Sequence, residues 1–141
     1  MFLLDTNVVS ALRRPDKADP RVLGWAVRLP LASSFISAVT VLELELGALL
    51  AARKDAEKGA VLRSWIDLQV LPRFEGRILP VDVAVAQRCA RLHVPDPRAD
   101  RDALIAATAL VHGMTIATRN TRDFEPMGVE LVNPWTVPLQ P

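Results

Sequence analysis

The chain begins with a short apolar run, Phe2–Leu4, that is followed at once by an acidic residue, Asp5. An apolar run of this length, bounded by polar residues, is typical of a strand buried on both faces of a parallel sheet. In open α/β sheets the ligand crevice lies beyond the carboxyl ends of the strands. We therefore expect Asp5 at such a crevice, with Thr6 or Asn7 capping the helix that follows. The alternative is that Asp5 serves only as a helix cap.

Further short apolar runs alternate with segments of helical spacing. Strands are expected at 2–4, 34–36, 77–81, 115–118 and 129–132, and helices at 6–13, 20–29, 56–71, 82–93 and 98–112. A further helix is expected to open at Ser37 or Thr40 and to run to about Arg53. Residues 120–126 are expected to form a loop or a short helix. Strands separated by helices imply βαβ units and a parallel sheet covered on both faces. A length of 141 residues, with no repeat or linker, indicates a single domain over 1–141.

Two of these helices carry an expectation about burial. The helix that ends near Arg53 is apolar almost all round, which predicts that it is buried. The next helix has an apolar stripe that is expected to face the core, formed by Ala60, Leu62, Ile66 and Val70.

Composition excludes several kinds of site. The net charge of +1 means that any nucleic-acid-binding surface must be local. Cys89 is the single cysteine, so no intrachain disulfide can form, and its apolar neighbours favour a small core residue over a nucleophile. His93 and His112 provide little material for a histidine-rich metal site or a Ser/His/Asp triad. Without a signal-peptide pattern or an apolar run long enough for a membrane span, we expect a soluble cytoplasmic protein.

A second candidate acid, Glu43, lies among apolar helical neighbours. A buried ionised carboxylate is costly unless it is paired or bound to a metal. Gly47, four residues further on, removes a side chain beside this carboxylate and leaves room for a ligand. Two alternatives are open: Thr40 and Glu43 have the spacing of a capping box, and Glu45 is a rival acid on another face of the helix.

Other oxygen-bearing side chains lie near two further element ends. Asp102 begins a helix whose next same-face residues are mostly small, which allows close packing on the sheet. Acids are also favoured in first turns by the helix dipole, which is the preferred interpretation for Asp96 and Asp100 and stays open for Asp102. Asn120 and Asp123 lie just beyond the strand at 115–118, where Asp123 is also suited to a turn.

The acidic side chains expected at the edge of the sheet, taken together, predict the kind of reaction that this site can catalyse. Two like charges about 4 Å apart repel by about 1 kcal/mol in water and by roughly 4 kcal/mol at an effective dielectric constant of 20. A cluster of carboxylates therefore needs a cation or raised pKa values. Oxygen ligands suit Mg²⁺ or Mn²⁺, which activate water and neutralise charge on a phosphodiester. The pattern predicts hydrolysis of a nucleic-acid backbone without a histidine base.

Four ordered motifs resemble the PIN-domain family. They are Phe2-Leu-Leu-Asp-Thr-Asn7, Thr40-Val-Leu-Glu-Leu-Glu-Leu-Gly47, Asp102-Ala-Leu-Ile-Ala-Ala-Thr-Ala109 and Thr115-Ile-Ala-Thr-Arg-Asn120. Within that family the chain is most similar to the VapC/FitB-type toxins of bacterial toxin–antitoxin operons. Gly76-Arg-Ile-Leu-Pro80 and Val132-Asn-Pro-Trp135 point to the FitB-like branch. The resemblance covers essentially the whole chain.

This resemblance implies a three-layer α/β/α sandwich with a five-stranded parallel sheet. It also implies Mg²⁺- or Mn²⁺-dependent endoribonuclease activity, homodimers and inhibition by a cognate antitoxin. Asp5, Glu43 and Asp102 match the family's first three acids. In the FitB-like pattern the fourth acid falls where this chain has Asn120, so Asp123 is expected to complete the catalytic set. The expected metal ligands are Asp5, Asp102 and Asn120.

Supporting roles are expected for two hydroxyls, from the same resemblance, and for four arginines, from the need of an RNA substrate for positive charge. The hydroxyls of Thr6 and Thr118 are expected to fix Asp5 and the metal-bound water without binding the ion. Positive charge beside the acidic centre is expected to hold RNA phosphates, and each candidate arginine is equally suited to be a solvated surface charge. These candidates are Arg13, Arg14, Arg119 and Arg122.

Two other functions stay open. The chain is also compatible with a catalytically weakened PIN scaffold that binds nucleic acid or a partner protein, because Asn120 brings no charge. A DNA-directed nuclease of the wider superfamily is a third reading. The short chain, which has no added DNA-clamping segment, argues against it.

Overall fold

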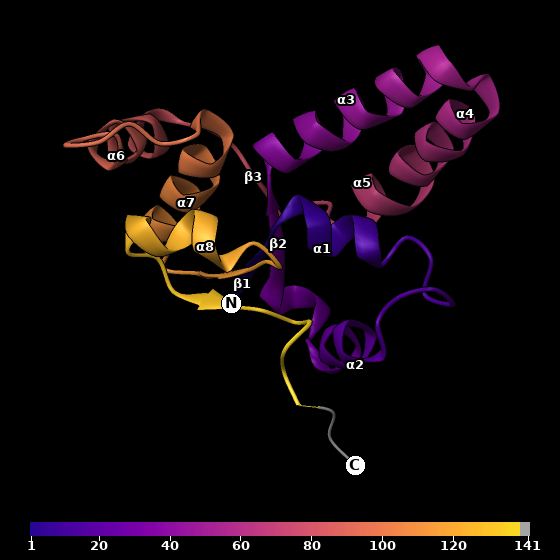
Figure 1. The fold of residues 1–141 in the computed structure, drawn as a ribbon, viewed down its shortest axis with the longest axis horizontal. Coiled ribbons are helices and arrows are strands. Elements are labelled where there is room, and N and C mark those ends of the chain that lie inside the picture. Colours follow the sequence, from indigo (N-terminus) through magenta and orange to yellow (C-terminus); the bar gives the residue numbers. More distant parts are fainter. Residues whose placement is uncertain (139–141) are drawn as a thin grey trace.

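A five-stranded parallel sheet runs through residues 1–138, the part of the chain that this computed structural model describes (Figure 1). Its strands are β1 (Phe2–Leu4), β2 (Ser34–Ser37), β3 (Ile78–Leu79), β4 (Thr115–Ala117) and β5 (Leu131–Val132). Their order in the sheet is β3-β2-β1-β4-β5, and every neighbouring pair is parallel. With helices on both faces, the predicted α/β/α sandwich is confirmed.

The helices lie close to the predicted ranges. They are α1 (Thr6–Ala11), α2 (Pro20–Arg28), α3 (Ala38–Lys54), α4 (Ala56–Trp65), α5 (Leu71–Arg73), α6 (Val83–Leu92), α7 (Asp100–His112) and α8 (Thr121–Phe124). Two 3₁₀ turns, η1 (Leu31–Ser33) and η3 (Glu125–Met127), and one π-helical segment, η2 (Ile66–Val70), complete the set. Among residues 1–138, no helix is both long and apolar enough to cross a bilayer.

The sheet separates two apolar cores. Successive strand residues point to opposite faces, so Leu3 joins the core under α6 and α7, whereas Leu4 joins the core under α1, η2 and part of α3. Ile116 and Ala117 of β4 divide in the same way. Figure 1 shows α6 and α7 on one side of the strands and α1 and α5 on the other. Burial on both faces explains why the strands read as unbroken apolar runs.

Most helices begin where the sequence supplies a side-chain cap. Asp19, Ser37, Asp55 and Asp82 each accept a hydrogen bond from a backbone N–H in the first turn of the next helix. Gly113 ends α7 with φ at +65°, a left-handed conformation that glycine adopts without steric cost. These local signals explain why most element boundaries were predictable.

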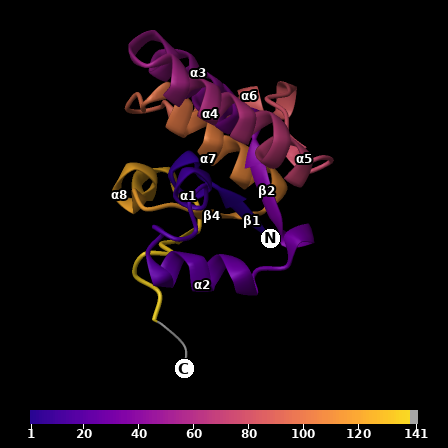
Figure 2. The same cartoon turned by 90° about the vertical axis from the view of Figure 1, so that its right-hand side faces the viewer.

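The pair formed by α3 and α4 departs from the expected burial. The two helices pack against each other at one end of the molecule (Figures 1 and 2). The prediction that α3 is buried all round is wrong, because Leu42, Leu49 and Leu50 are each more than half exposed. The cover over α3 is therefore incomplete, although its residues are apolar almost all round.

The segment after α3 is also less regular than the predicted single helix. It passes from α4 through the π-helical η2 into α5, which changes the face that each turn presents. Ala60 is consequently exposed, Leu62 is half-buried, and only Ile66 and Val70 of the predicted stripe are fully buried.

A prediction follows for the contact between α3 and α4. A Cβ added at Gly59 would lie 2.5 Å from the Cα of Ala52, which is closer than real Cβ contacts. We expect Gly59→Ala to lower the free energy of unfolding by about 1–3 kcal/mol through overpacking, although alanine is favoured over glycine in helices by about 1 kcal/mol. Gly24→Ala in α2 is the matched control, because its nearest contact is the Arg28 side chain at 3.8 Å. Denaturant melts that find Gly59→Ala as stable as Gly24→Ala would contradict this packing.

Candidate active site

Asp5 lies directly after β1 and is buried, with only 6% of its surface exposed. Its Oδ1 accepts a hydrogen bond from the Thr6 backbone N–H at 2.8 Å, so Asp5 itself caps α1. The prediction that Thr6 or Asn7 caps this helix is therefore wrong. Asp5 Oδ2 accepts hydrogen bonds from the Thr118 hydroxyl at 2.7 Å and from Asn7 Nδ2 at 3.3 Å. The cap thus uses one oxygen and leaves the other among polar groups from β4 and α1.

Glu43 on α3 is linked to Asp5 through Thr6. Its Oε1 accepts a hydrogen bond from the Thr6 hydroxyl at 2.8 Å, and that hydroxyl lies 3.1 Å from the Thr40 hydroxyl. The prediction that the Thr6 hydroxyl fixes Asp5 is wrong, because the Thr6 backbone contacts Asp5 and its hydroxyl contacts Glu43. The second Glu43 oxygen, Oε2, lies 3.5 Å from Arg101 Nη1.

The two alternatives for Glu43 do not agree with the structure. Helix α3 begins at Ala38 with Ser37 as its cap, so Thr40 lies inside the helix and forms no capping box with Glu43. Glu45 faces α4, where Arg63 binds it through two hydrogen bonds, and this contact lowers the pKa of Glu45. Glu45 is therefore a structural acid between two helices, and Glu43 is the one that faces Asp5.

Asp102, in the first turn of α7, is half-buried and lies near the other acids. Burial raises its pKa, and the charges of Asp5 and Asp123 raise it further, with a smaller contribution from Glu43. Burial also raises the pKa of Asp5 and outweighs its hydrogen bonds, which act in the opposite direction. Glu43 and Asp123 again add to the rise. The structure thus brings together the four acids Asp5, Glu43, Asp102 and Asp123, which come from four separate elements.

The neighbouring acids are placed differently. Asp100 lies in the first turn of α7 with its side chain 93% exposed, as the helix-dipole interpretation predicted. Asp96 is an exposed residue of the preceding loop rather than of the helix, so the first-turn interpretation is wrong for it. Neither contributes to the pKa shifts of Asp5 or Asp102.

Asn120 is the residue before α8, and Asp123 lies within this short helix. The Asn120 backbone N–H donates to the Thr118 hydroxyl at 3.0 Å, and its carbonyl accepts from the Asp123 N–H at 3.1 Å. Both side chains are exposed. The charge of Asp123 raises the pKa of Asp5 and of Asp102. Asn120 is uncharged, and its backbone is bonded to Thr118 at the same edge of the sheet.

The predicted arginines are dispersed. Arg119 directly follows Thr118, and its backbone N–H donates to Asn7 Oδ1 at 3.2 Å. Arg122 is exposed on α8 beside Asp123. Arg13 lines a shallow pocket with α4 and η2, and Arg14 is exposed in the loop after α1.

Two residues of the site escaped sequence reasoning. Arg101 was overlooked although a cation in the first turn of a helix opposes the helix dipole, which is a signal that it has another partner. Asn7 was considered only as a cap, yet its Nδ2 also donates to the Thr118 hydroxyl at 3.3 Å. No local sequence pattern predicts the hydrogen bond between Asn7 and Thr118, because these two residues meet only when β1 and β4 pair.

These residues fit a small divalent cation. All the donors are carboxylate, amide or hydroxyl oxygens, and among the contacting side chains only Arg101 is positively charged. Within residues 1–138, no three His, Cys, Asp or Glu side chains converge into a ready-made cage for an ion. An ion held here would keep several waters, as Mg²⁺ and Mn²⁺ commonly do.

Cys89 lies in the apolar core, as predicted, and burial raises the pKa of its thiol.

The sequence matches the PIN domain family over residues 2–129. It is 41% identical to Toxin FitB of Neisseria gonorrhoeae, an alignment that covers 96% of this chain and 99% of that protein. It is 37% identical to VapC ribonuclease Y4jK of Sinorhizobium fredii, over 96% of this chain and 98% of that protein. The fold matches the crystal structure of FitAcB from Neisseria gonorrhoeae with a TM-score of 0.88 and 40% identity, over 97% of this chain and 100% of that chain. A DNA-bound VapBC structure from Salmonella typhimurium shares the fold, with a TM-score of 0.74 and 22% identity over 94% of this chain and 97% of that one.

The raised pKa of Asp5 leads to a prediction for the metal-free protein. Asn at this position keeps the cap and removes a buried charge, so Asp5→Asn is expected to preserve or raise Tm at neutral pH. In the wild type, Asp5 binds a proton in the folded state before the unfolded chain does. Stability should therefore rise as pH falls towards the ordinary value of 3.8, and rise less in the variant.

Thermal melts in chelator at several pH values measure this difference, with Asp16→Asn at an exposed loop position as the control. A fall in Tm of more than about 5 °C for Asp5→Asn, which corresponds to roughly 1.5 kcal/mol, would instead make the charged form of Asp5 structural.

Proposed function

This chain belongs to the PIN-domain family, and from that premise we propose that it is a metal-dependent endoribonuclease that acts as the cytoplasmic toxin of a toxin–antitoxin pair. The observation that carries the proposal is that Asp5, Glu43, Asp102 and Asp123 lie close enough for their charges to raise the pKa of Asp5 and of Asp102, with Glu43 bonded to the Thr6 hydroxyl beside Asp5. Four ionised acids that repel one another are unfavourable unless a cation neutralises them or some of them bind protons, and a bound cation would relieve the repulsion at neutral pH. The ribonuclease activity is suggested by the name of a VapC relative.

Each side chain has a proposed task at a stated atom. Asp5 Oδ2 and the Asp102 carboxylate would hold Mg²⁺ or Mn²⁺, with the Asn120 amide oxygen or Asp123 completing the set. When bound, the ion supplies Lewis acidity and a more acidic water. Thr118 keeps Asp5 Oδ2 in place through its hydroxyl, at 2.7 Å.

Glu43 is the proposed acceptor of the proton that the attacking water loses. Its Oε1 is fixed by the Thr6 hydroxyl, so the carboxylate cannot rotate freely. Its Oε2 is paired with Arg101 at 3.5 Å, a long contact to a half-exposed guanidinium that can turn towards a phosphate instead. Arg119 and Arg122 add positive charge along the same edge.

Partner proteins are part of the proposal. The similar solved structures are toxin–antitoxin complexes, some of them bound to DNA, and we infer a cognate antitoxin and a homodimer for this chain. An apolar pocket of about 420 Å³ between α2 and η2 is a candidate for antitoxin contact. Its lining includes Leu23, Trp25, Leu29, Trp65 and Val70.

A second candidate function is a scaffold with weakened catalysis that binds nucleic acid or a partner protein. The observation in its favour is Asn120, which supplies no charge where the FitB-like pattern has an acid. The metal experiment below separates the two functions, because a scaffold would show neither stabilisation by metal nor RNA cleavage.

We expect Mn²⁺ to stabilise the protein and to support RNA cleavage, and Asp102→Asn to remove both effects. Ligand linkage gives about 2.7 kcal/mol of stabilisation when the free ion is at 100 times its dissociation constant. Loss of Asp102 should lower the cleavage rate by at least ~100-fold, as for other groups that stabilise charge in the transition state.

The measurements are thermal melts and cleavage of a panel of structured RNAs, with Mn²⁺, with Mg²⁺ and with chelator. Asp100→Asn is the matched control, since this exposed acid lies in the same helical turn. Unchanged cleavage by Asp102→Asn would remove Asp102 from the mechanism.

Asp123→Ala is expected to lower kcat/KM more than Asn120→Ala does. The reason is that the charge of Asp123 reaches both Asp5 and Asp102, whereas Asn120 offers only a neutral oxygen. Steady-state cleavage of one RNA by the two variants measures the order. The reverse order would make Asn120, not Asp123, the fourth group of the site.

A further inference from the structure

Arg119 is held above an indole ring rather than paired with an acid. Its guanidinium carbon lies 5.3 Å from the centroid of the Trp135 ring, a cation–π contact. Within residues 1–138, no acidic side chain lies within ion-pair distance of Arg119. A guanidinium stacked on a ring keeps its N–H edge free for an anion.

A chain of hydrogen bonds connects Arg119 to the acidic centre. Its backbone N–H donates to Asn7 Oδ1, and Asn7 Nδ2 in turn donates to Asp5 Oδ2 at 3.3 Å. Arg119 also directly follows Thr118, whose hydroxyl donates to that same carboxylate at 2.7 Å. The arginine backbone is therefore fixed relative to Asp5 by contacts from both β4 and α1.

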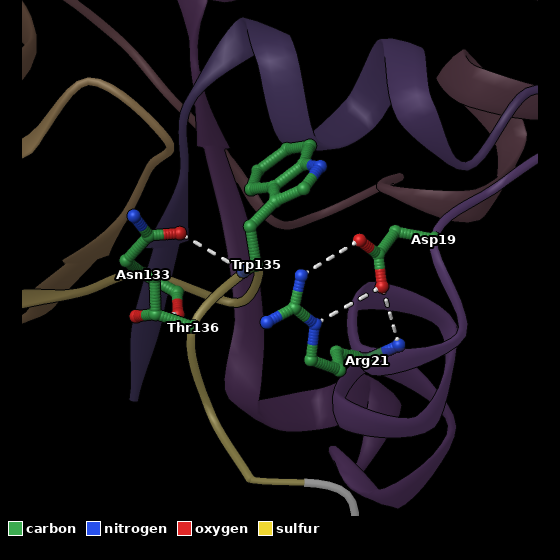
Figure 3. Close-up of polar contacts among 5 residues, drawn as sticks. All are labelled: Asp19, Arg21, Asn133, Trp135 and Thr136. Carbon is green, nitrogen blue, oxygen red and sulfur yellow. Dashed lines mark hydrogen bonds and ion pairs between the residues drawn. The ribbon is translucent and has the colours of Figure 1, made fainter.

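Trp135 is fixed by the turn that follows β5. Asn133 Oδ1 accepts a hydrogen bond from the Trp135 N–H at 2.9 Å, and the Thr136 N–H donates to the Asn133 carbonyl at 3.1 Å. The ring packs against the core that includes Leu4. Figure 3 shows the indole projecting from this turn towards the helices, near the paired Asp19 and Arg21. The turn therefore presents a rigid surface to the Arg119 side chain.

Two charged residues of α2 and its cap, Asp19 and Arg21, leave the positive charge of Arg119 available to an anion. Arg21 binds Asp19 through its Nε and Nη2 atoms, so the charge of this acid, which Arg119 also influences, is already neutralised. Arg21 is the main cause of the lowered pKa of Asp19, and Arg119 contributes the last and smallest part. The cluster of Asp19, Arg21 and Arg119 has a net positive charge.

We propose that Arg119, supported by Trp135, forms a subsite that binds one phosphate of a single-stranded RNA next to the phosphate that reacts at the carboxylates. Arg119 contacts the substrate, and Trp135 is a positioning residue that acts through Arg119. This subsite rests on the proposed ribonuclease function. The subsite would explain why the segment 133–135 lies beside a carboxylate site although none of its side chains is charged.

The test measures RNA binding separately from cleavage. The full-length chain carrying Asp102→Asn, without metal, is titrated into a fluorescein-labelled single-stranded RNA and into a DNA of the same sequence, at several salt concentrations. Arg119→Gln is expected to weaken binding roughly tenfold, the size of one charge-assisted contact. It should also reduce the salt slope by about 0.7, the value for one phosphate of a single strand. Because the contact is to phosphate, the RNA and the DNA should lose affinity by the same factor.

A double-mutant cycle tests the role of Trp135. Trp135→Leu is expected to weaken binding about two- to fivefold, the range of an exposed cation–π contact. Trp135→Phe should restore most of the loss, because it keeps a ring. In the Arg119→Gln background, Trp135→Leu should have no further effect on binding, since the two residues act as a unit. Arg91→Gln, an exposed arginine on α6, is the matched control and should leave binding unchanged.

The outcomes separate this inference from the proposed function. An unchanged affinity and salt slope for Arg119→Gln would overturn the subsite, and so would losses that add fully in the double mutant, which indicate that Trp135 is only structural. A loss confined to RNA would also overturn it, because a phosphate contact does not distinguish ribose from deoxyribose. Cleavage by the wild type in Mn²⁺ tests the ribonuclease proposal by itself. A protein that cleaves RNA without depending on Arg119 refutes the subsite alone.

Discussion

The buried carboxylate of Asp5 is the constraint on which the rest of the site depends. Burial makes its charge unfavourable, and hydrogen bonds from Thr6, Asn7 and Thr118 offset only part of that cost. These donors come from α1 and from the residue that follows β4, so the pairing of β1 with β4 is a condition for holding the charge. A fold that keeps such a carboxylate at the edge of its sheet gains most when a cation neutralises it.

The sheet order determines which groups surround Asp5. Because β1 lies between β2 and β4, the residues after these strands converge at one edge. Helix α3, which follows β2, contributes Glu43. The turn after β4 contributes Thr118 and Arg119, and the short helix α8 contributes Asp123. Helix α7 contributes Asp102 together with Arg101. Acidic and basic groups are therefore arranged side by side, an arrangement that would suit the proposed cleavage of an RNA phosphodiester.

Local patterns were sufficient for most of the fold and insufficient for choices that depend on facing surfaces. Apolar runs, capping residues such as Ser37 and Asp82, and Gly113 predicted where elements begin and end. Periodicity could not choose between Glu43 and Glu45, because both lie on one largely apolar helix. The choice was made by Arg63 on α4, which pairs with Glu45. The same helix also leaves leucines exposed where the pattern predicted burial.

The sequence by itself determined the class of fold and the chemical character of the site, because strand-like runs, helix caps and the acids that follow them are encoded within a few consecutive residues. Only the tertiary structure determined which of the carboxylate and hydroxyl oxygen atoms lie within hydrogen-bonding distance of one another. That Asp5 both caps a helix and joins the acidic cluster, that Thr6 bridges Asp5 and Glu43, and that Trp135 supports Arg119 all depend on contacts between distant segments. Such contacts leave no periodic trace in a sequence, since each involves one residue from each segment and forms only after the strands have paired.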